Sequence, residues 1–100
     1  MLKIKWLDAT EAKKFGALMA NLVINRTPKS PESMKENRLT KIHESMIVQL
    51  DKKIADFRKT HTLNIYTKAQ MGNVFKWTLL ERKYDSDYVD QLTTYILRRF

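Results

Sequence analysis

The sequence contains no cysteine, only two glycines and only two prolines in 100 residues. The absence of cysteine excludes disulfides, thiolate catalysis and cysteine-ligated metal sites, and it is compatible with a reducing compartment. Two glycines cannot build the glycine-rich loop that cradles nucleotide phosphates. No apolar run approaches the ~18 residues that a membrane span needs. These absences remove several classes of enzyme and membrane protein from consideration.

Residue types that commonly carry catalysis are also scarce. His43 and His61 are the only histidines, and no H-E-x-x-H or other histidine–carboxylate spacing is present. Asp85, Asp87 and Asp90 lack the following glycine and the distal glutamate of a calcium loop. Carboxylates are expected at a helix start for electrostatic reasons. We therefore predict no catalytic residues, no metal, no cofactor and no enzymatic activity.

Positive charge is the strongest global signal, because 19 Lys and Arg oppose 11 Asp and Glu and give a formal net charge of +8. Basic proteins gain affinity for nucleic acid and for anionic membrane surfaces. Residues 1–50 hold nine basic and five acidic side chains, and residues 51–100 hold ten and six. Such an even spread is also typical of an ordinary solvated surface.

Hydrophobic residues make up 43% of the chain and charged residues 30%. These values fit one globular domain, residues 1–100, with enough apolar side chains for a core. The first 16 residues lack the apolar core of a secretory signal. We therefore expect a soluble, cytoplasmic protein without a membrane partner.

The longest helical pattern runs from Ser30 to Thr60. Ser30 suits an N-cap and Pro31 suits the first helical position. An apolar residue recurs every three or four positions, which predicts one buried stripe. Its members are Leu39, Ile42, Met46, Leu50, Ile54 and Phe57. A continuous helix over 31–59 would span about 44 Å, so it must bend, project onto a partner or lie in an elongated bundle.

Three further helices are predicted. The first covers residues 8–25, with a capping box at Asp8 and Glu11. Its apolar stripe is Phe15, Leu18, Met19, Leu22 and Val23, and small residues at intervals of four predict the close approach of another helix: Ala12, Gly16 and Ala20. Another helix starts at Thr67, which forms a T-x-x-Q box with Gln70. The last runs from a cap at Asp85 or Ser86 to about residue 99.

These patterns predict a mainly α fold, in which four helices form a single domain around a long central helix. Alternating apolar residues at 2–6 and 62–66 add the option of one small two-stranded β-ribbon. Such a ribbon would need helices packed on it to be stable.

The first functional hypothesis concerns the polar face of the long helix. Four basic residues cluster there opposite the apolar stripe: Arg38, Lys41, Lys52 and Lys59. They are spaced to meet phosphates along ~30 Å of helix, and Lys13, Lys14, Lys68 and Lys76 could extend the surface. We predict a small basic binding protein that associates with nucleic acid. The competing interpretation of this face is an ordinary solvated surface.

The alternative is a helical protein–protein interaction module that acts as a homodimer, an adaptor or a regulator. Seven of the ten aromatic residues follow residue 60, and Tyr and Trp are favoured in interface cores. A small core cannot easily hold them all. Trp77, Leu80 and Tyr88 are therefore the candidates for a partner-protein interface, unless they pack on the terminal segments around Trp6.

Overall fold

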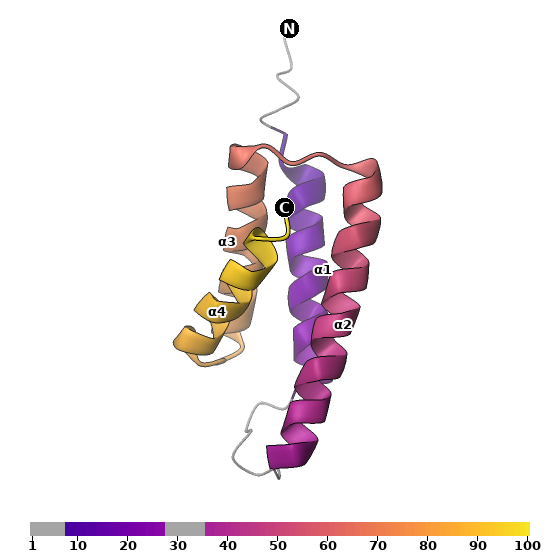
Figure 1. The fold of residues 1–100 in the computed structure, drawn as a ribbon. Helices are drawn as coiled ribbons and strands as arrows, with labels where there is room; N and C mark the ends of the chain where they lie inside the picture. Colours follow the sequence, from indigo (N-terminus) through magenta and orange to yellow (C-terminus); the bar gives the residue numbers. More distant parts are fainter. Residues whose placement is uncertain (1–7, 28–35) are drawn as a thin grey trace, which may run out of the picture.

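The computed structural model describes residues 8–27 and 36–100, and this part of the chain contains four α-helices (Figure 1). They are α1 (Thr10–Arg26), α2 (Glu36–Thr60), α3 (Ile65–Glu81) and α4 (Ser86–Leu97). Helix α1 lies between α2 and α3 and contacts both, while α4 packs against α3 (Figure 1). The mainly α class and the four predicted helices are thus confirmed.

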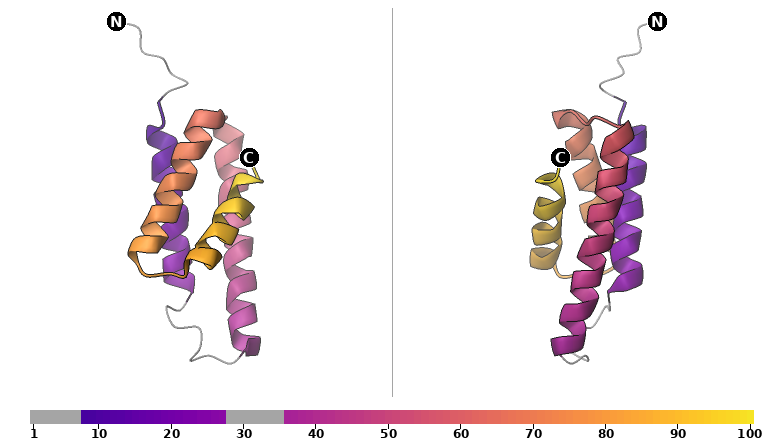
Figure 2. Two further views of the ribbon diagram at one scale, coloured as in Figure 1. Left: turned by 90° about the vertical axis from the view of Figure 1, so that its left-hand side faces the viewer. Right: turned by 45° about the vertical axis from the view of Figure 1, so that its right-hand side comes forward.

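The predicted long central helix is not confirmed. Helix α2 is the longest of the four, with 25 residues, but all four helices contribute to one shared core and α2 does not lie at its centre (Figure 2). The N-terminal end of α2 extends past the ends of α1 and α3 (Figure 2). The predicted start at Pro31 lies outside the described residues.

The prediction of a strand at 62–66 is wrong. Residues 61–64 have no regular secondary structure, and Ile65 and Tyr66 belong to the first turn of α3. Asn64 caps this helix: its side-chain oxygen accepts from the Thr67 backbone N–H at 2.8 Å, and the Thr67 hydroxyl accepts from the Asn64 N–H at 3.0 Å. This reciprocal pair outweighs the strand preference of the neighbouring β-branched and aromatic residues. The other predicted strand, residues 2–6, lies outside the described residues.

The remaining helix ends agree with the sequence to different degrees. Asp85 caps α4 as predicted and accepts from the Tyr88 N–H at 3.0 Å. Helix α1 starts after Ala9, and Asp8 accepts from the Thr10 N–H instead of forming the predicted box with Glu11. Helix α3 ends in a Schellman motif. There the Tyr84 N–H donates to Leu79 O and the Lys83 N–H donates to Leu80 O, with Lys83 at a φ of 69°.

Helices α1 and α3 approach each other closely at Gly16. A Cβ atom added there would lie 2.5 Å from the carbonyl oxygen of Met71. Ala12 and Ala20, one turn away on either side, are buried at the same contact face. The small residues at intervals of four therefore do what their spacing predicts, because they let two helix backbones come together.

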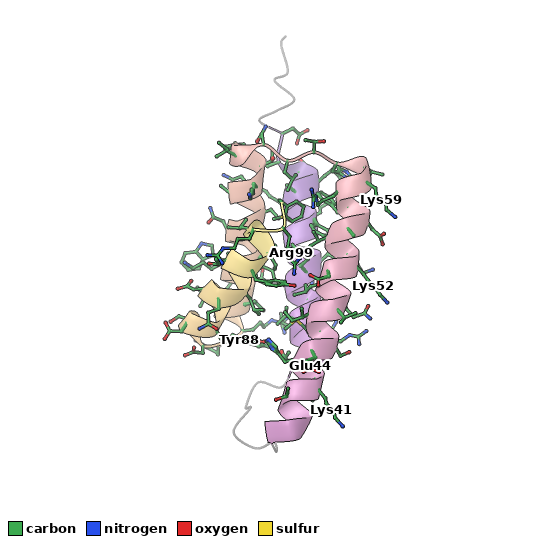
Figure 3. The ribbon with its side chains drawn as sticks, viewed as in Figure 1. Lys41, Glu44, Lys52, Lys59, Tyr88 and Arg99 are labelled. Atoms are coloured by element: carbon green, nitrogen blue, oxygen red, sulfur yellow. The ribbon has the colours of Figure 1, made fainter. Side chains whose placement is uncertain are left out.

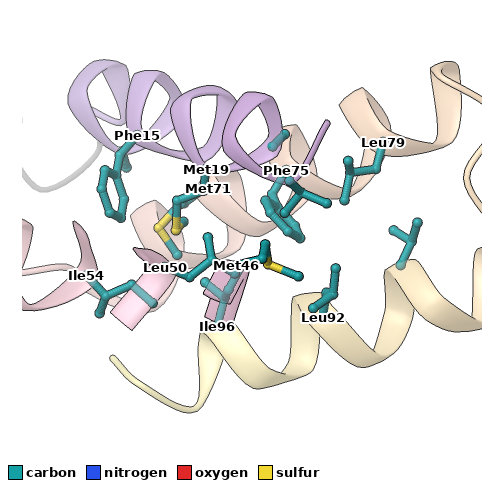
Figure 4. Close-up of a cluster of buried hydrophobic side chains, with 14 residues drawn as sticks. Phe15, Met19, Met46, Leu50, Ile54, Met71, Phe75, Leu79, Leu92 and Ile96 are labelled. Atoms are coloured by element: carbon teal, nitrogen blue, oxygen red, sulfur yellow. The ribbon is translucent and has the colours of Figure 1, made fainter. Parts of the chain in front are cut away.

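The core lies between the four helices (Figure 4). Its largest fully buried side chains are Phe75, Met19, Met46, Leu50, Met71, Leu79, Ile96, Val23 and Val89. At one end, Phe15 of α1 stacks on Phe57 of α2, with 4.2 Å between ring centroids and 10° between ring planes. Leu18 is an exception to the predicted stripe of α1, because 45% of it is exposed.

Candidate functional site

The outer face of α2 carries the lysines that the sequence singles out. Lys41, Lys52 and Lys59 are separated by eleven and seven residues, which are about three and two helical turns. All three are exposed, and Figure 3 shows them pointing away from the bundle along one side of α2. The side chain of Arg38 lies outside the described part of the structure. We call Lys41, Lys52 and Lys59 the lysine line.

Little within the described residues neutralises this line. Lys59 Nζ lies 3.8 Å from Asp56 Oδ1, and more than 70% of each side chain is exposed. Such a pair contributes little to stability, because water and salt screen it. No ion pair forms between Lys41 or Lys52 and any other described residue. The three ammonium groups are therefore accessible to an external anion.

A second basic feature lies where α1 and α2 meet. An open groove of about 690 Å³ lies along α1, and Lys14 and Arg26 of α1 line it together with Lys53 of α2. Asn21 and Asn25 add amide groups to its wall. Lys14 is 3.8 Å from Glu11, whereas Arg26 and Lys53 form no ion pair with other described residues.

The other lysines named in the sequence analysis differ in how much they add to a basic surface. Lys14 joins the groove, but Lys76 Nζ of α3 lies 3.3 Å from Asp90 Oδ1 of α4. It is therefore partly neutralised on another side of the molecule. Lys53 and Arg26 were missed at the sequence level. In the sequence they look like ordinary surface residues of two helices. They become candidates for a shared site only once α1 and α2 are known to be neighbours.

The three residues predicted for a protein interface differ in their exposure. Trp77 is 59% exposed. Leu80 and Tyr88 are half-buried and pack against the core. Tyr88 points from α4 towards α2 (Figure 3), and its hydroxyl lies 3.2 Å from His43 Nδ1. Trp77 is thus the only one of the three that presents a large free surface.

The Tyr88–His43 contact is one of three contacts that tyrosine hydroxyl groups make with residues far away in the chain. The second contact joins Tyr84 to Thr27 at the end of α1, with 3.1 Å between the two hydroxyl oxygens. The ring of Tyr84 is stacked with that of Tyr88, at 6.5 Å between ring centroids. Burial, and to a lesser extent the neighbouring Tyr84, raise the pKa of Tyr88 to about 12. Tyr88 therefore stays neutral at physiological pH and serves the packing of α4 on α2.

The third contact joins Tyr95 of α4 to Asp51 of α2. The Tyr95 hydroxyl donates to Asp51 Oδ1 at 2.7 Å, and Arg99 lies over the Tyr95 ring at 4.6 Å. Burial, followed by the hydrogen bond to Asp51, raises the pKa of Tyr95. Asp51 is therefore engaged by α4 and does not face the lysine line.

Neither histidine has the surroundings of a metal ligand. His61 stacks on Phe57 at 4.2 Å, and its Nδ1 lies 2.8 Å from the Thr60 hydroxyl. Within residues 8–27 and 36–100, no three His, Asp or Glu side chains gather in a way that could hold a metal ion. None of the helices in these ranges has the length and apolar content needed to cross a membrane.

Comparison of the chain with models of protein families, with curated proteins and with solved structures finds no significant match.

Proposed function

We propose that this protein binds nucleic acid without sequence preference, through the lysine line of α2. The observation that carries the proposal is that Lys41, Lys52 and Lys59 share one exposed side of a single rigid helix. A helix holds its charges in fixed positions, so an extended polyanion can meet all three at once without reordering the backbone. The formal net charge of +8 adds long-range attraction.

The spacing of the line suits a polymer better than a small anion. From Lys41 to Lys59 the helix rises about 27 Å, whereas a duplex carries one phosphate charge about every 1.7 Å along its axis. No single small ligand reaches all three ammonium groups, but a nucleic-acid backbone passes every one of them. Contacts to phosphates fix position and not sequence, so the expected binding is non-specific.

The groove between α1 and α2 supports the same function. Lys53 and Arg26, which form no ion pair with another described residue, place two more cations in this groove. Asn21 and Asn25 can donate to phosphate or sugar oxygens. A strand that follows the lysine line can therefore make further contacts towards α1.

The test is fluorescence anisotropy with labelled 20-base-pair DNA and RNA duplexes at 50 and 200 mM salt. The three contacts of the lysine line alone predict a slope of about −2.7 in log K against log salt, which is about a 40-fold loss of affinity over this range, and contacts of Lys53 and Arg26 steepen it. The variant Lys41→Gln/Lys52→Gln/Lys59→Gln should weaken binding and make the salt slope shallower by about 2.7. Gln retains a high helix propensity, so the fold should persist.

The matched control removes three positive charges outside α2, as Lys68→Gln/Arg82→Gln/Arg98→Gln, at one position in α3 and at the C-caps of α3 and α4. None of these side chains forms an ion pair with another described residue. If both triple variants weaken binding equally, net charge alone acts and the lysine line is not the site. Absence of binding at 50 mM salt with 100 μM protein would refute the proposed function.

A further inference from the structure

Helix α3 carries an exposed stripe that the bundle does not use. Tyr66, Gln70, Asn73 and Trp77 follow one another at steps of four, three and four, so they share one side of the helix. This side is opposite the buried Met71, Phe75 and Leu79. Tyr66 is 40% exposed and Trp77 is 59% exposed, Asn73 is also exposed, and Gln70 is half-buried. We call these four residues the α3 stripe.

The two rings of the α3 stripe have no partner within the described residues. Neither Tyr66 nor Trp77 makes a ring contact or a side-chain hydrogen bond there. Trp and Tyr carry a large apolar surface and a polar group that seeks a hydrogen bond. Their exposure on one line therefore marks an interaction surface more clearly than a single exposed apolar residue does.

The stripe is uncharged on a strongly basic protein. All four members are neutral, while the chain as a whole has a net charge of +8. Two copies of the chain repel each other over most approaches, but they can meet at this stripe without opposing like charges. Helix α3 and helix α2 lie on opposite sides of α1 (Figure 1), so contact at α3 leaves the lysine line free.

The order of residues in the stripe is symmetric. Tyr66 and Trp77 lie at equal distances from the midpoint between Met71 and Gly72, and Gln70 and Asn73 flank that midpoint. An antiparallel pair of α3 helices about a two-fold axis through this point brings Trp77 of each copy against Tyr66 of the other. Near the axis, amides meet amides and can pair by hydrogen bonds. A two-fold contact needs such a self-complementary surface.

We propose that the α3 stripe is the contact surface for a second copy of this chain, in an antiparallel two-fold dimer. At ~250 Å² for a whole large aromatic side chain, the exposed fractions of 59% for Trp77 and 40% for Tyr66 leave about 250 Å² per copy. A dimer therefore buries at most about 500 Å² of aromatic surface, before the amides are counted. This is well below the ~1,600 Å² of a standard interface. The dimer is therefore weak and reversible.

Sedimentation equilibrium from 10 μM to 1 mM tests the dimer. Trp77→Ala should weaken association at least tenfold. Ile65→Ala is the matched control, because Ile65 is 90% exposed but lies on another side of α3. Higher salt should strengthen the dimer by screening repulsion, whereas it weakens nucleic-acid binding. The two proposals can therefore fail independently.

A charge exchange tests the symmetry. The variants Gln70→Lys/Asn73→Lys and Gln70→Glu/Asn73→Glu should each be monomeric, because like charges then meet at the axis. An equimolar mixture of the two should dimerise, since each positive pair faces a negative one. A wild-type monomer at 1 mM would overturn the proposal. So would an equal effect of Ile65→Ala and Trp77→Ala, or a mixture that stays monomeric.

Discussion

Replacing Gly16 with alanine should loosen the closest helix contact in the bundle. The added Cβ would lie 2.5 Å from the Met71 carbonyl oxygen, and Cβ contacts below 3.0 Å essentially do not occur. Helices α1 and α3 must therefore separate by about 0.5 Å or more. A gap of this size forfeits about a quarter of the dispersion energy of each contact that it affects.

The magnitude follows from two opposing effects. Overpacking a core costs about 1–3 kcal/mol, and we expect the upper part of this range because the obstructing atom belongs to the backbone and cannot rotate away. Alanine is better than glycine in a helix by about 1 kcal/mol. The net loss of unfolding free energy should be about 1–2 kcal/mol, which lowers Tm by about 5–15 °C in a domain of this size.

Gly72 provides the matched control, because it is the only other glycine and is also buried within a helix. A Cβ there would meet the flexible end of Leu97, with 3.3 Å to the nearest methyl carbon. Helix propensity should dominate, so Gly72→Ala should be neutral or stabilising by up to about 1 kcal/mol. Urea denaturation of both variants measures the difference. If Gly16→Ala is as stable as Gly72→Ala, the close approach of α1 and α3 is wrong.

Three further predictions concern caps and pH. Asn64→Ala removes the cap of α3 and should lower the unfolding free energy by about 1 kcal/mol in urea titrations. Lys83→Gly should raise Tm because Lys83 has a positive φ, whereas Arg82→Gly, at a φ of −88°, should lower it. The folded state holds the Tyr88 proton more tightly than the unfolded chain, so this contribution to stability is complete below pH 10 and is lost as pH rises towards 12. Tyr88→Phe should therefore reduce the loss of stability between pH 9 and 11.5, and equal losses in both proteins would contradict this assignment.

The sequence predicts helices well where one apolar stripe decides which face is buried. In α2, Met46, Leu50 and Ile54 are buried as their spacing indicates. In α1, the small residues also face the core, at the contact with α3. The helix is consequently rotated, and Leu18 faces solvent despite its place in the apolar pattern. Residue size alone does not show which side of such a helix is buried.

The candidate functional residues also divide into those that the sequence identifies and those that only the structure identifies. Lys41, Lys52 and Lys59 could be grouped from sequence, because helical period alone determines which residues share a side. Tyr88 could not be assigned, because its partner His43 is 45 positions away in the chain. The groove lined by Lys53 and Arg26 also depends on which helices are neighbours. The periodicity of apolar residues in one sequence does not show which helices pack against each other.

The contact between α1 and α3 has a consequence for how the chain folds during and after synthesis. Gly16 and Met71 are 55 positions apart, so the tightest helix contact joins segments that are not consecutive. Loop closure must precede this contact, and folding should be slower than in a bundle whose helices dock in chain order. On the ribosome, α1 emerges before its main partner has been synthesised. A nascent chain that ends after α2 therefore exposes the small-residue face of α1, which α3 covers in the folded protein.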